Sequence, residues 1–271
     1  MTASKLNRLR SLVRNIQPLI HSITNPISIN QCANTVLAVG AQPIMAEHPD
    51  EVKEITLSSK ALLLNLGNIT DVRIKSMLIS AAAAKENNIP FVLDAVGVAC
   101  SEFRRNFALN LIENITPTVI KGNYSEINAL NSPIYKSSGV DADNSLTTKT
   151  MSYAAIQLSQ KYNSVILASG KTDIITDGKK IVYIKNGTPQ LARITGTGCM
   201  LGALCACFLP VSSPFEAAIT ACATLGICGE LSESDNGNGS FMIKLIDNLS
   251  VLSDRNLEKH LTLEEEKIEI Y

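Results

Sequence analysis

Short apolar runs alternate along this chain with longer segments in which apolar residues recur every three or four positions. The short runs predict buried strands, and the longer segments predict amphipathic helices. Their regular alternation is typical of parallel strands joined by crossover helices, which indicates an α/β fold. The predicted strands are residues 18–23, 42–45, 61–66, 91–94, 118–121 and 164–168. The predicted helices are residues 30–39, 50–57, 71–87, 101–115 and 146–161.

The pattern changes after residue 168. Asp177-Gly178 lies between two alternating runs, and this dipeptide is a strong signal of a tight hairpin. We therefore expect an antiparallel edge on a mostly parallel sheet. Residues 197–252 predict three helices, broken near Pro214 and by the polar, glycine-rich residues 236–240. The polar residues 132–144 predict a loop, and the charged residues 261–271 give little structural information.

Length and charge limit the classes of protein that this chain can be. Its 271 residues are enough for one large α/β domain, residues 1–271, with two small domains as the alternative. The 24 basic and 25 acidic residues nearly cancel, so no overall field attracts nucleic acid or an anionic membrane. The basic residues 5–14 predict one face of a solvated helix. No secretory signal is evident, and the longest apolar run, residues 199–210, is too short to cross a bilayer.

The seven cysteines show no C-x-x-C spacing, and five of them lie in apolar helical segments. This arrangement favours free thiols in a reducing compartment, so we expect a cytoplasmic protein. The three histidines are scattered, and none pairs with a cysteine at the spacing of metal ligands. The cysteines from Cys205 to Cys228 are predicted to fill the core.

The segment ITGTGCMLGALCACFLP, residues 194–210, joins a glycine-rich turn to an almost uncharged helix. Gly196 and Gly198 allow a tight turn and the close approach of a ligand. The amides of Thr197, Gly198 and Cys199 are the unpaired donors of the first helical turn, where the helix dipole favours an anion. An ordinary loop before a buried helix is the alternative interpretation. Cys199 favours a functional one, because a first-turn cysteine next to a bound anion is a candidate base or nucleophile.

Polar side chains also follow two of the predicted strands. Asp94 ends one strand, and Lys121 ends another, with Glu126 in the first turn of the helix that follows it. Each has an ordinary alternative role, as a helix cap or a first-turn carboxylate. Ligands bind beyond the carboxyl ends of the strands in such folds. Together, two carboxylates, a lysine and an anion site supply what phosphoryl transfer needs, with Asp94 and Glu126 as oxygen ligands for Mg²⁺.

Five blocks of sequence resemble the hydroxyethylthiazole kinases, the thiamine-salvage members of the ribokinase-like fold, and the resemblance runs from about Pro18 to Leu252. The blocks are HSITNPISINQCANTVLAVGAQPIMA, LLLNLGNIT, LDAVGVACSEFRR, VIKGNYSEINAL and ASGKTDIITDGKKIVYIKNGTPQLARITGTGCMLGALCACFL. The last two are the most specific, because other ribokinase-like kinases generally have aspartate where this chain has Cys199. The resemblance implies a three-layer fold with helices on both faces of a mostly parallel sheet.

The resemblance also implies roles for individual residues. Met45 and Gly196 would contact the thiazole alcohol, with Asn25 near them. Lys121 and Ser169 would contact ATP, and Thr197 and Gly198 supply the phosphate-binding amides predicted above.

Three positions depart from the family. Relatives commonly have arginine at Lys121, threonine at Ser169 and proline at Ala95. Lysine keeps the charge but loses the planar fork of arginine. Alanine at position 95 frees the backbone beside Asp94, which with Glu126 matches the positions associated with magnesium.

The reaction that we expect is transfer of the γ-phosphoryl group of ATP to the hydroxyl of 4-methyl-5-(2-hydroxyethyl)thiazole, with Cys199 in the place of the base. Ile27, Ile29 and Met45 predict an apolar wall that suits a heteroaromatic substrate. One alternative keeps the fold and changes the chemistry, to a hydroxymethylpyrimidine kinase or a nicotinamide-hydrate dehydratase. Another is a sensor that binds thiazole or thiamine without catalysis. The resemblance further implies a homotrimer with its sites between subunits.

Overall fold

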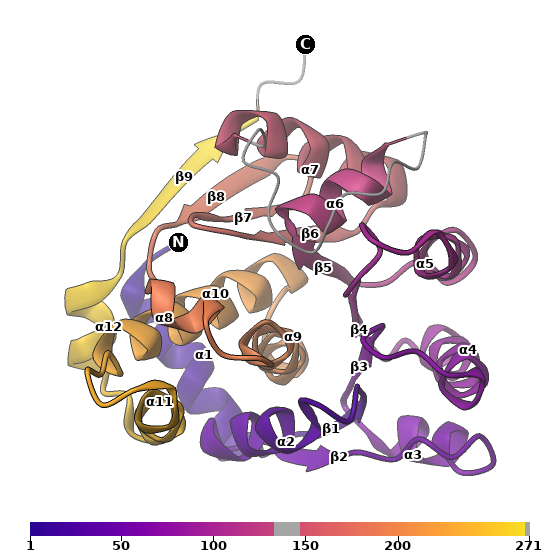
Figure 1. Ribbon diagram of the computed structural model, residues 1–271, viewed down its shortest axis with the longest axis horizontal. Coiled ribbons are helices and arrows are strands. Elements are labelled where there is room, and N and C mark those ends of the chain that lie inside the picture. Colours follow the sequence, from indigo (N-terminus) through magenta and orange to yellow (C-terminus); the bar gives the residue numbers. More distant parts are fainter. Residues whose placement is uncertain (133–146, 269–271) are drawn as a thin grey trace.

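The structure is a computed structural model that describes residues 1–132 and 147–268 (Figure 1). The described residues form one mixed sheet of nine strands in the order β2-β1-β3-β4-β5-β6-β7-β8-β9. The strands are β1 (Leu19–Ile23), β2 (Gln42–Ile44), β3 (Ala61–Asn65), β4 (Phe91–Asp94), β5 (Val119–Asn123), β6 (Val165–Ser169), β7 (Asp173–Thr176), β8 (Lys180–Ile184) and β9 (Leu263–Lys267). Pairing is parallel from β2 through β6 and antiparallel from β6 to β9.

Helices cover both faces of the sheet, which confirms the predicted three-layer α/β class (Figure 1). On one face lie α3 (Val52–Ser58), α4 (Asp71–Glu86), α5 (Glu102–Ile115), α6 (Tyr124–Asn131) and α7 (Thr148–Tyr162). On the other lie α1 (Ala3–Ile16), α2 (Ile29–Ala38), α9 (Thr197–Phe208), α10 (Pro214–Leu231), α11 (Asn238–Val251) and α12 (Asp254–His260), and the short α8 (Pro189–Ala192) precedes α9. The helices predicted from the pattern are confirmed, with small shifts at their ends.

Each face of the sheet packs into its own hydrophobic cluster. On β3, Leu62 and Leu64 pack into the cluster under α4 and α5, whereas Leu63 packs into the cluster under α9. A strand that is buried on both faces reads as a continuous apolar run rather than an alternating one. This is why the LLL run marked a strand in the sequence.

The hairpin predicted at Asp177-Gly178 joins β7 to β8. Gly178 has a φ of 80°, a conformation that glycine adopts without strain. The Oδ1 atom of Asp177 accepts hydrogen bonds from the amides of Lys179 and Lys180, at 2.9 and 2.8 Å, which closes the turn.

The structure adds to the sequence analysis at both chain ends. Residues 261–271 gave little structural information, and within them β9 pairs with β8 along its whole length. The pattern failed because β9 is an exposed edge strand of sequence LEEEK, with no buried face to impose alternation. Residues 269–271 lie outside the described residues.

Residues 5–14 do form a helix, but Arg10 is buried rather than solvated, and its guanidinium donates to Asn7, to the Leu252 carbonyl and to Asp254. These bonds tie α1 to the C-terminal segment. The predicted loop at residues 132–144 lies outside the described residues, apart from Ser132. None of the helices within the described ranges is both long and apolar enough to span a membrane.

Candidate active site

The carboxyl ends of neighbouring parallel strands bring the predicted polar residues to one edge of the sheet. In the strand register, Asn65 on β3 is opposite Asp94 on β4, and Asp94 is opposite Lys121 on β5. Ser169 ends β6, and Asn25 follows β1 by two residues. The first turns of α9 lie next to this edge, which brings residues that are far apart in sequence close together.

A buried ion pair lies at the centre of this edge. The Nζ atom of Lys121 is 2.9 Å from Oδ1 of Asp94, and the two residues are 3% and 0% exposed. Burial raises the pKa of Asp94 to about 6, because the lysine only partly offsets lost hydration and the nearby Glu126 adds to the rise. Burial by itself lowers the pKa of Lys121, but Asp94 and the neighbouring Cys199 and Glu126 together outweigh that effect and raise it.

Asp94 is also held from its other side. Its Oδ2 atom accepts a hydrogen bond of 2.9 Å from Nδ2 of Asn65. The Oδ1 atom of Asn65 accepts from the Gly67 amide at 2.9 Å and from Nδ2 of Asn25 at 3.2 Å. The same Nδ2 of Asn25 donates to the sulfur of Cys199 at 3.4 Å. Continuous contacts therefore link Lys121 to Cys199.

The start of α9 has the form predicted for an anion site. Gly196 precedes the helix with a φ of 97°, and the first intrahelical bond runs from the Met200 amide to the Gly196 carbonyl. The amides of Thr197, Gly198 and Cys199 have no acceptor among the described residues, and they carry the positive end of the helix dipole.

Two further contacts define this turn. A Cβ atom on Gly198 would lie only 3.6 Å from Nζ of Lys121, so the ammonium group adjoins the helix start. The hydroxyl of Thr197 donates to the carbonyls of Leu191 and Ile194, at 2.7 and 3.1 Å, and holds the loop before α9 in place. Thr197 thus offers its amide, rather than its hydroxyl, to a ligand.

Beside α9 lies a cavity of about 600 Å³. Three of the predicted nucleotide-binding residues line it, namely Ser169, Thr197 and Gly198, together with Gly170 and apolar groups such as Leu201. Lys121 does not line this cavity but lies at its edge, beneath Gly198. The cavity has the size and the mixed lining expected for a nucleotide.

The residues predicted to bind the substrate lie on the other side of the α9 start. A Cβ atom on Gly196 would be 3.2 Å from Cβ of Ser28, so the loop that carries Asn25 touches the glycine turn. Met45 directly follows β2, is half-buried, and packs against the hydrophobic cluster that contains Cys199. Ile27, expected in an apolar wall, is instead 62% exposed within this chain.

The carboxylates of Asp94 and Glu126 are the candidate magnesium ligands, and each of their four oxygens already accepts a hydrogen bond. Glu126 accepts from the Gly97 amide through Oε1 and from the Asn123 amide through Oε2, at 2.8 and 2.7 Å. Each of these oxygens therefore has one protein donor, and its remaining lone pair can accept a hydrogen bond from a water molecule. The donor set therefore fits a hydrated Mg²⁺ held through its water shell, which the ion prefers to keep.

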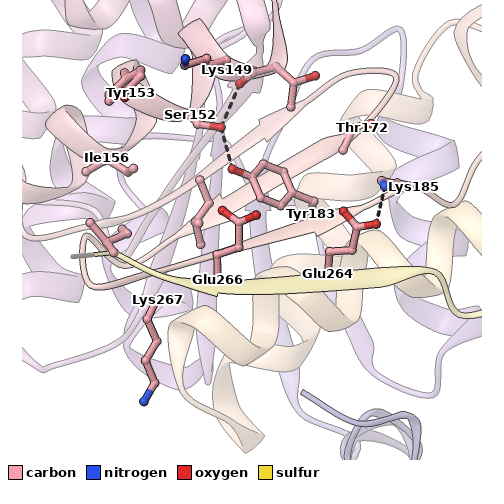
Figure 2. Close-up of a pocket in the computed structure, with 13 residues that line it drawn as sticks. Lys149, Ser152, Tyr153, Ile156, Thr172, Tyr183, Lys185, Glu264, Glu266 and Lys267 are labelled. Carbon is pink, nitrogen blue, oxygen red and sulfur yellow. Dashed lines mark hydrogen bonds and ion pairs between the residues drawn. The ribbon is translucent and has the colours of Figure 1, made fainter.

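A second cavity, of about 640 Å³, lies between α7 and strands β8 and β9 (Figure 2). Charges of both signs line it, including Lys149, Glu264 and Glu266, and Glu264 forms an ion pair with Lys185. None of the predicted site residues lines it. Ser169, Thr197 and Gly198 line the cavity beside α9 instead.

The other buried cysteines behave as core residues, as predicted. All seven cysteines are free, and burial raises the pKa of Cys32, Cys205 and Cys228 to about 12. Cys199 differs from them in position, because it lies in the first turn of α9 and accepts a hydrogen bond from Asn25.

Sequence reasoning missed two residues of this site. Asn65 is fully buried and contacts both Asp94 and Asn25, but as an asparagine after an apolar run it resembles an ordinary end of a strand. Asp173 lines the cavity beside α9, and burial raises its pKa to about 6. The signal available for both was their position at strand ends on the edge that carries Asp94.

Comparison with known proteins agrees with this geometry. A sequence profile of the hydroxyethylthiazole kinase family matches residues 10–255. The chain belongs to this family. Hydroxyethylthiazole kinase 2 of Clostridium botulinum (strain Hall) is 46% identical over 94% of this chain and 98% of its own length. Hydroxyethylthiazole kinase 1 of Methanosphaera stadtmanae is 41% identical over 93% of this chain and 94% of its own length.

Solved structures extend the comparison to the fold. The hydroxyethylthiazole kinase protein of Pyrococcus horikoshii OT3 superposes with a TM-score of 0.89 at 29% identity, covering 97% of this chain and all of its own. The pyridoxal kinase of Staphylococcus aureus shares the fold at a TM-score of 0.65 and 16% identity, over 93% of this chain and 99% of its own. The predicted ribokinase-like architecture and the family resemblance are thus confirmed.

The substitution Lys121→Met leaves the buried Asp94 carboxylate without its cation. We expect the free energy of unfolding at neutral pH to fall by about 3 to 5 kcal/mol. The pKa of Asp94 is raised even with its partner, so the folded variant takes up a proton more readily than the unfolded chain does. Without Lys121 the pKa of Asp94 rises further, so the deficit should shrink as the pH falls toward about 6 and then level off, because the wild type takes up the same proton there.

Urea denaturation across a pH series measures this difference, and the Lys121→Met/Asp94→Asn double variant is the matched control. It removes both charges and keeps an acceptor for Asn65, so it should recover much of the lost stability. A Lys121→Met deficit that does not change with pH would contradict the assignment of the cost to an unpaired Asp94.

Proposed function

We propose that this chain, acting as a single domain, transfers the γ-phosphoryl group of ATP to the hydroxyl of 4-methyl-5-(2-hydroxyethyl)thiazole in thiamine salvage. Family membership over residues 10–255 supports the substrate and the reaction class. The observation that carries the proposal is the meeting of the free amides at the start of α9 with Lys121, at the edge of the nucleotide-sized cavity. Both features attract phosphate oxygens.

The proposed mechanism rests on electrostatics and positioning. The ATP phosphates bind the amides of Thr197, Gly198 and Cys199 and the ammonium group of Lys121, while Ser169 contacts the nucleotide. Charge spreads over the transferred phosphoryl group in its loose transition state, and these fixed donors stabilise it without reorganising. Asp94 keeps Lys121 in place, so the cation is already oriented before ATP arrives.

We place Mg²⁺ in this reaction through water molecules held by Asp94 and Glu126. When bound, the ion neutralises phosphate charge and helps to orient the phosphoryl group. The protein's part is to fix the two carboxylates, Glu126 by the amides of Gly97 and Asn123 and Asp94 by Lys121 and Asn65.

Cys199 is the proposed base for the substrate hydroxyl. The Cys199 sulfur accepts a hydrogen bond from Asn25, and Cys199 directly follows Gly198, whose amide is proposed to bind phosphate. We place the acceptor alcohol beside this sulfur, where it can approach the γ-phosphorus. Met45 and Gly196 are proposed to contact the thiazole. A loose transition state needs little proton removal early in the reaction, so a weak base suffices.

The first test is release of ADP from magnesium-ATP by the purified protein with the thiazole alcohol, beside hydroxymethylpyrimidine, with product mass confirmed. We expect ADP release that depends on the thiazole and yields its monophosphate. Phosphorylation of the pyrimidine alone would keep the phosphate site and overturn the substrate. Thiazole binding without product would indicate a sensor, and ATP-dependent removal of water from nicotinamide hydrates would indicate the dehydratase.

Substitution of Cys199 tests its role as the base. We expect Cys199→Ser and Cys199→Ala to lower kcat by about 100-fold, within the usual range for a general base, while ATP still binds. Cys199→Asp should retain activity, because a carboxylate can accept the same proton. The control is Cys207→Ala, which removes a buried thiol of the same helix away from the site and should leave kcat unchanged. An inactive Cys199→Asp enzyme that binds both substrates would contradict the assignment.

We further infer a homotrimer whose sites lie between subunits. Ile27 and Ile243 are 62% and 66% exposed, and the groove between α2 and α11 is lined by Gln31 and Ile243 among others. The Oε1 atom of Gln31 is buried without a hydrogen-bond partner among the described residues, close to Gly196. An exposed apolar rim with an unpaired amide suits a neighbouring chain beside the substrate pocket.

Light scattering during gel filtration tests this inference. We expect the mass of three chains, and we expect Ile243→Lys on α11 to reduce it and to raise KM for the thiazole more than for ATP. The matched exposed control is Tyr153→Lys on α7, on the opposite face of the sheet, which should leave the mass unchanged. A monomer with full activity would overturn the shared site.

The free, buried cysteines also support residence in a reducing compartment, and we propose the cytoplasm.

A further inference from the structure

Asn65 links Asp94, which holds the lysine proposed to bind phosphate, to Asn25, which lies beside the proposed base. We propose that Asn65 is a positioning residue that sets the orientation of both Asp94 and Asn25, and through Asn25 the environment of the Cys199 sulfur. The proposal deepens the proposed function, because it rests on the roles assigned above to Asp94 and Cys199. The observation that carries it is the pattern of donors and acceptors around one fully buried amide.

The neighbours of Asn65 allow only one orientation of its side chain. The Gly67 amide can only donate, so the atom facing it is the oxygen Oδ1. The Asp94 carboxylate can only accept, so the atom facing it is the nitrogen Nδ2. Rotation of the amide by half a turn would place like groups against each other on both sides. The orientation of Asn65 is therefore fixed by the fold.

The fixed oxygen of Asn65 then determines what Asn25 does. The Oδ1 atom of Asn25 accepts from the Ser28 amide at 3.1 Å, which leaves its Nδ2 atom as the donor. That nitrogen is shared between Oδ1 of Asn65 and the sulfur of Cys199, at 3.2 and 3.4 Å. Asn65 thus draws the amide of Asn25 into a place where it donates to the sulfur. If the sulfur takes part in proton transfer, a hydrogen bond donated to it stabilises its thiolate form.

The backbone around these side chains leaves little room for another arrangement. A Cβ atom on Gly67 would lie 2.7 Å from Nδ2 of Asn25 and 2.9 Å from Oδ1 of Asn65. A Cβ atom on Gly202 of α9 would lie 3.2 Å from Oδ2 of Asp94. Glycines therefore lie against the polar atoms on both sides, and the close approach makes the network rigid.

This arrangement predicts how the loss of Asn65 divides between binding and chemistry. Asn65→Leu keeps the number and branching of the side-chain heavy atoms and removes all three hydrogen bonds. We expect kcat to fall by about 10- to 100-fold, the usual effect of losing a residue that orients site groups. KM for ATP should change little, because Asn65 does not line the cavity beside α9. Asn65→Ser, which retains a donor and an acceptor, should recover part of kcat and serves if the leucine variant folds poorly.

A double-mutant cycle separates positioning from a purely structural role. The part of the effect that runs through Cys199 should disappear in a Cys199→Ala background, so Asn65→Leu should lower kcat less there than in the wild type, by more than the 2-fold or so within which uncoupled effects vary. Independent effects would instead multiply. The control is Leu64→Val on the same strand, which packs into the opposite cluster and should lower thermal stability while leaving kcat unchanged.

The outcomes distinguish this proposal from the one that it rests on. Wild-type kcat in Asn65→Leu, with loss of activity in Cys199→Ser and Asp94→Asn, would overturn the positioning role and leave the proposed function intact. Multiplying effects in the cycle would also overturn the action through Cys199. Unchanged activity in Cys199→Ser and Asp94→Asn would overturn the assigned site itself.

Discussion

The buried ion pair between Lys121 and Asp94 is the interaction on which the rest of the site depends. Removing two charges from water costs several kcal/mol for each ion, and only good geometry with further hydrogen bonds offsets that cost. The structure supplies both, because adjacent parallel strands place the two residues in register and Asn65 satisfies the second carboxylate oxygen. Both oxygens of Asp94 accept hydrogen bonds, one from Lys121 and one from Asn65. The Asp94 charge is already committed to holding the lysine that faces the phosphate site.

The position of α9 follows from the same requirement. Almost every residue of this helix is buried, between the sheet on one side and α10 on the other, so its start cannot shift without disturbing the core. Gly196, Gly198 and Gly202 then bring its backbone close to Ser28, Lys121 and Asp94, respectively. The helix start and the ion pair thus form one rigid unit, and a rigid donor set is what electrostatic stabilisation of a transition state requires.

The sequence predicted most of this fold because its strands are buried on both faces and its turns have specific signals. The run LLLN marked β3, and Asp177-Gly178 marked the hairpin. It gave no signal for β9, whose glutamates are exposed on an edge strand, and it missed the burial of Arg10, which depends on contacts with residues more than two hundred positions away. At the site, strand ends identified Asp94 and Lys121. Asn65 escaped notice because its importance comes from the orientation of neighbouring side chains, which no spacing along the chain encodes.

The two halves of the site differ in how completely one chain builds them. The phosphate half is closed, since the amides of α9, Lys121 and the carboxylates are all fixed by contacts within the chain. The proposed acceptor half is less complete, because Ile27 is exposed and the buried Oε1 atom of Gln31 has no hydrogen-bond partner among the described residues. Phosphoryl transfer makes the same electrostatic demands whatever the alcohol, whereas the alcohol itself is selected by the shape and polarity of its wall. In the proposed trimer, contacts between subunits would therefore determine which alcohol binds. The proposed role of Asn65 is to keep the phosphate-binding residues aligned with that alcohol.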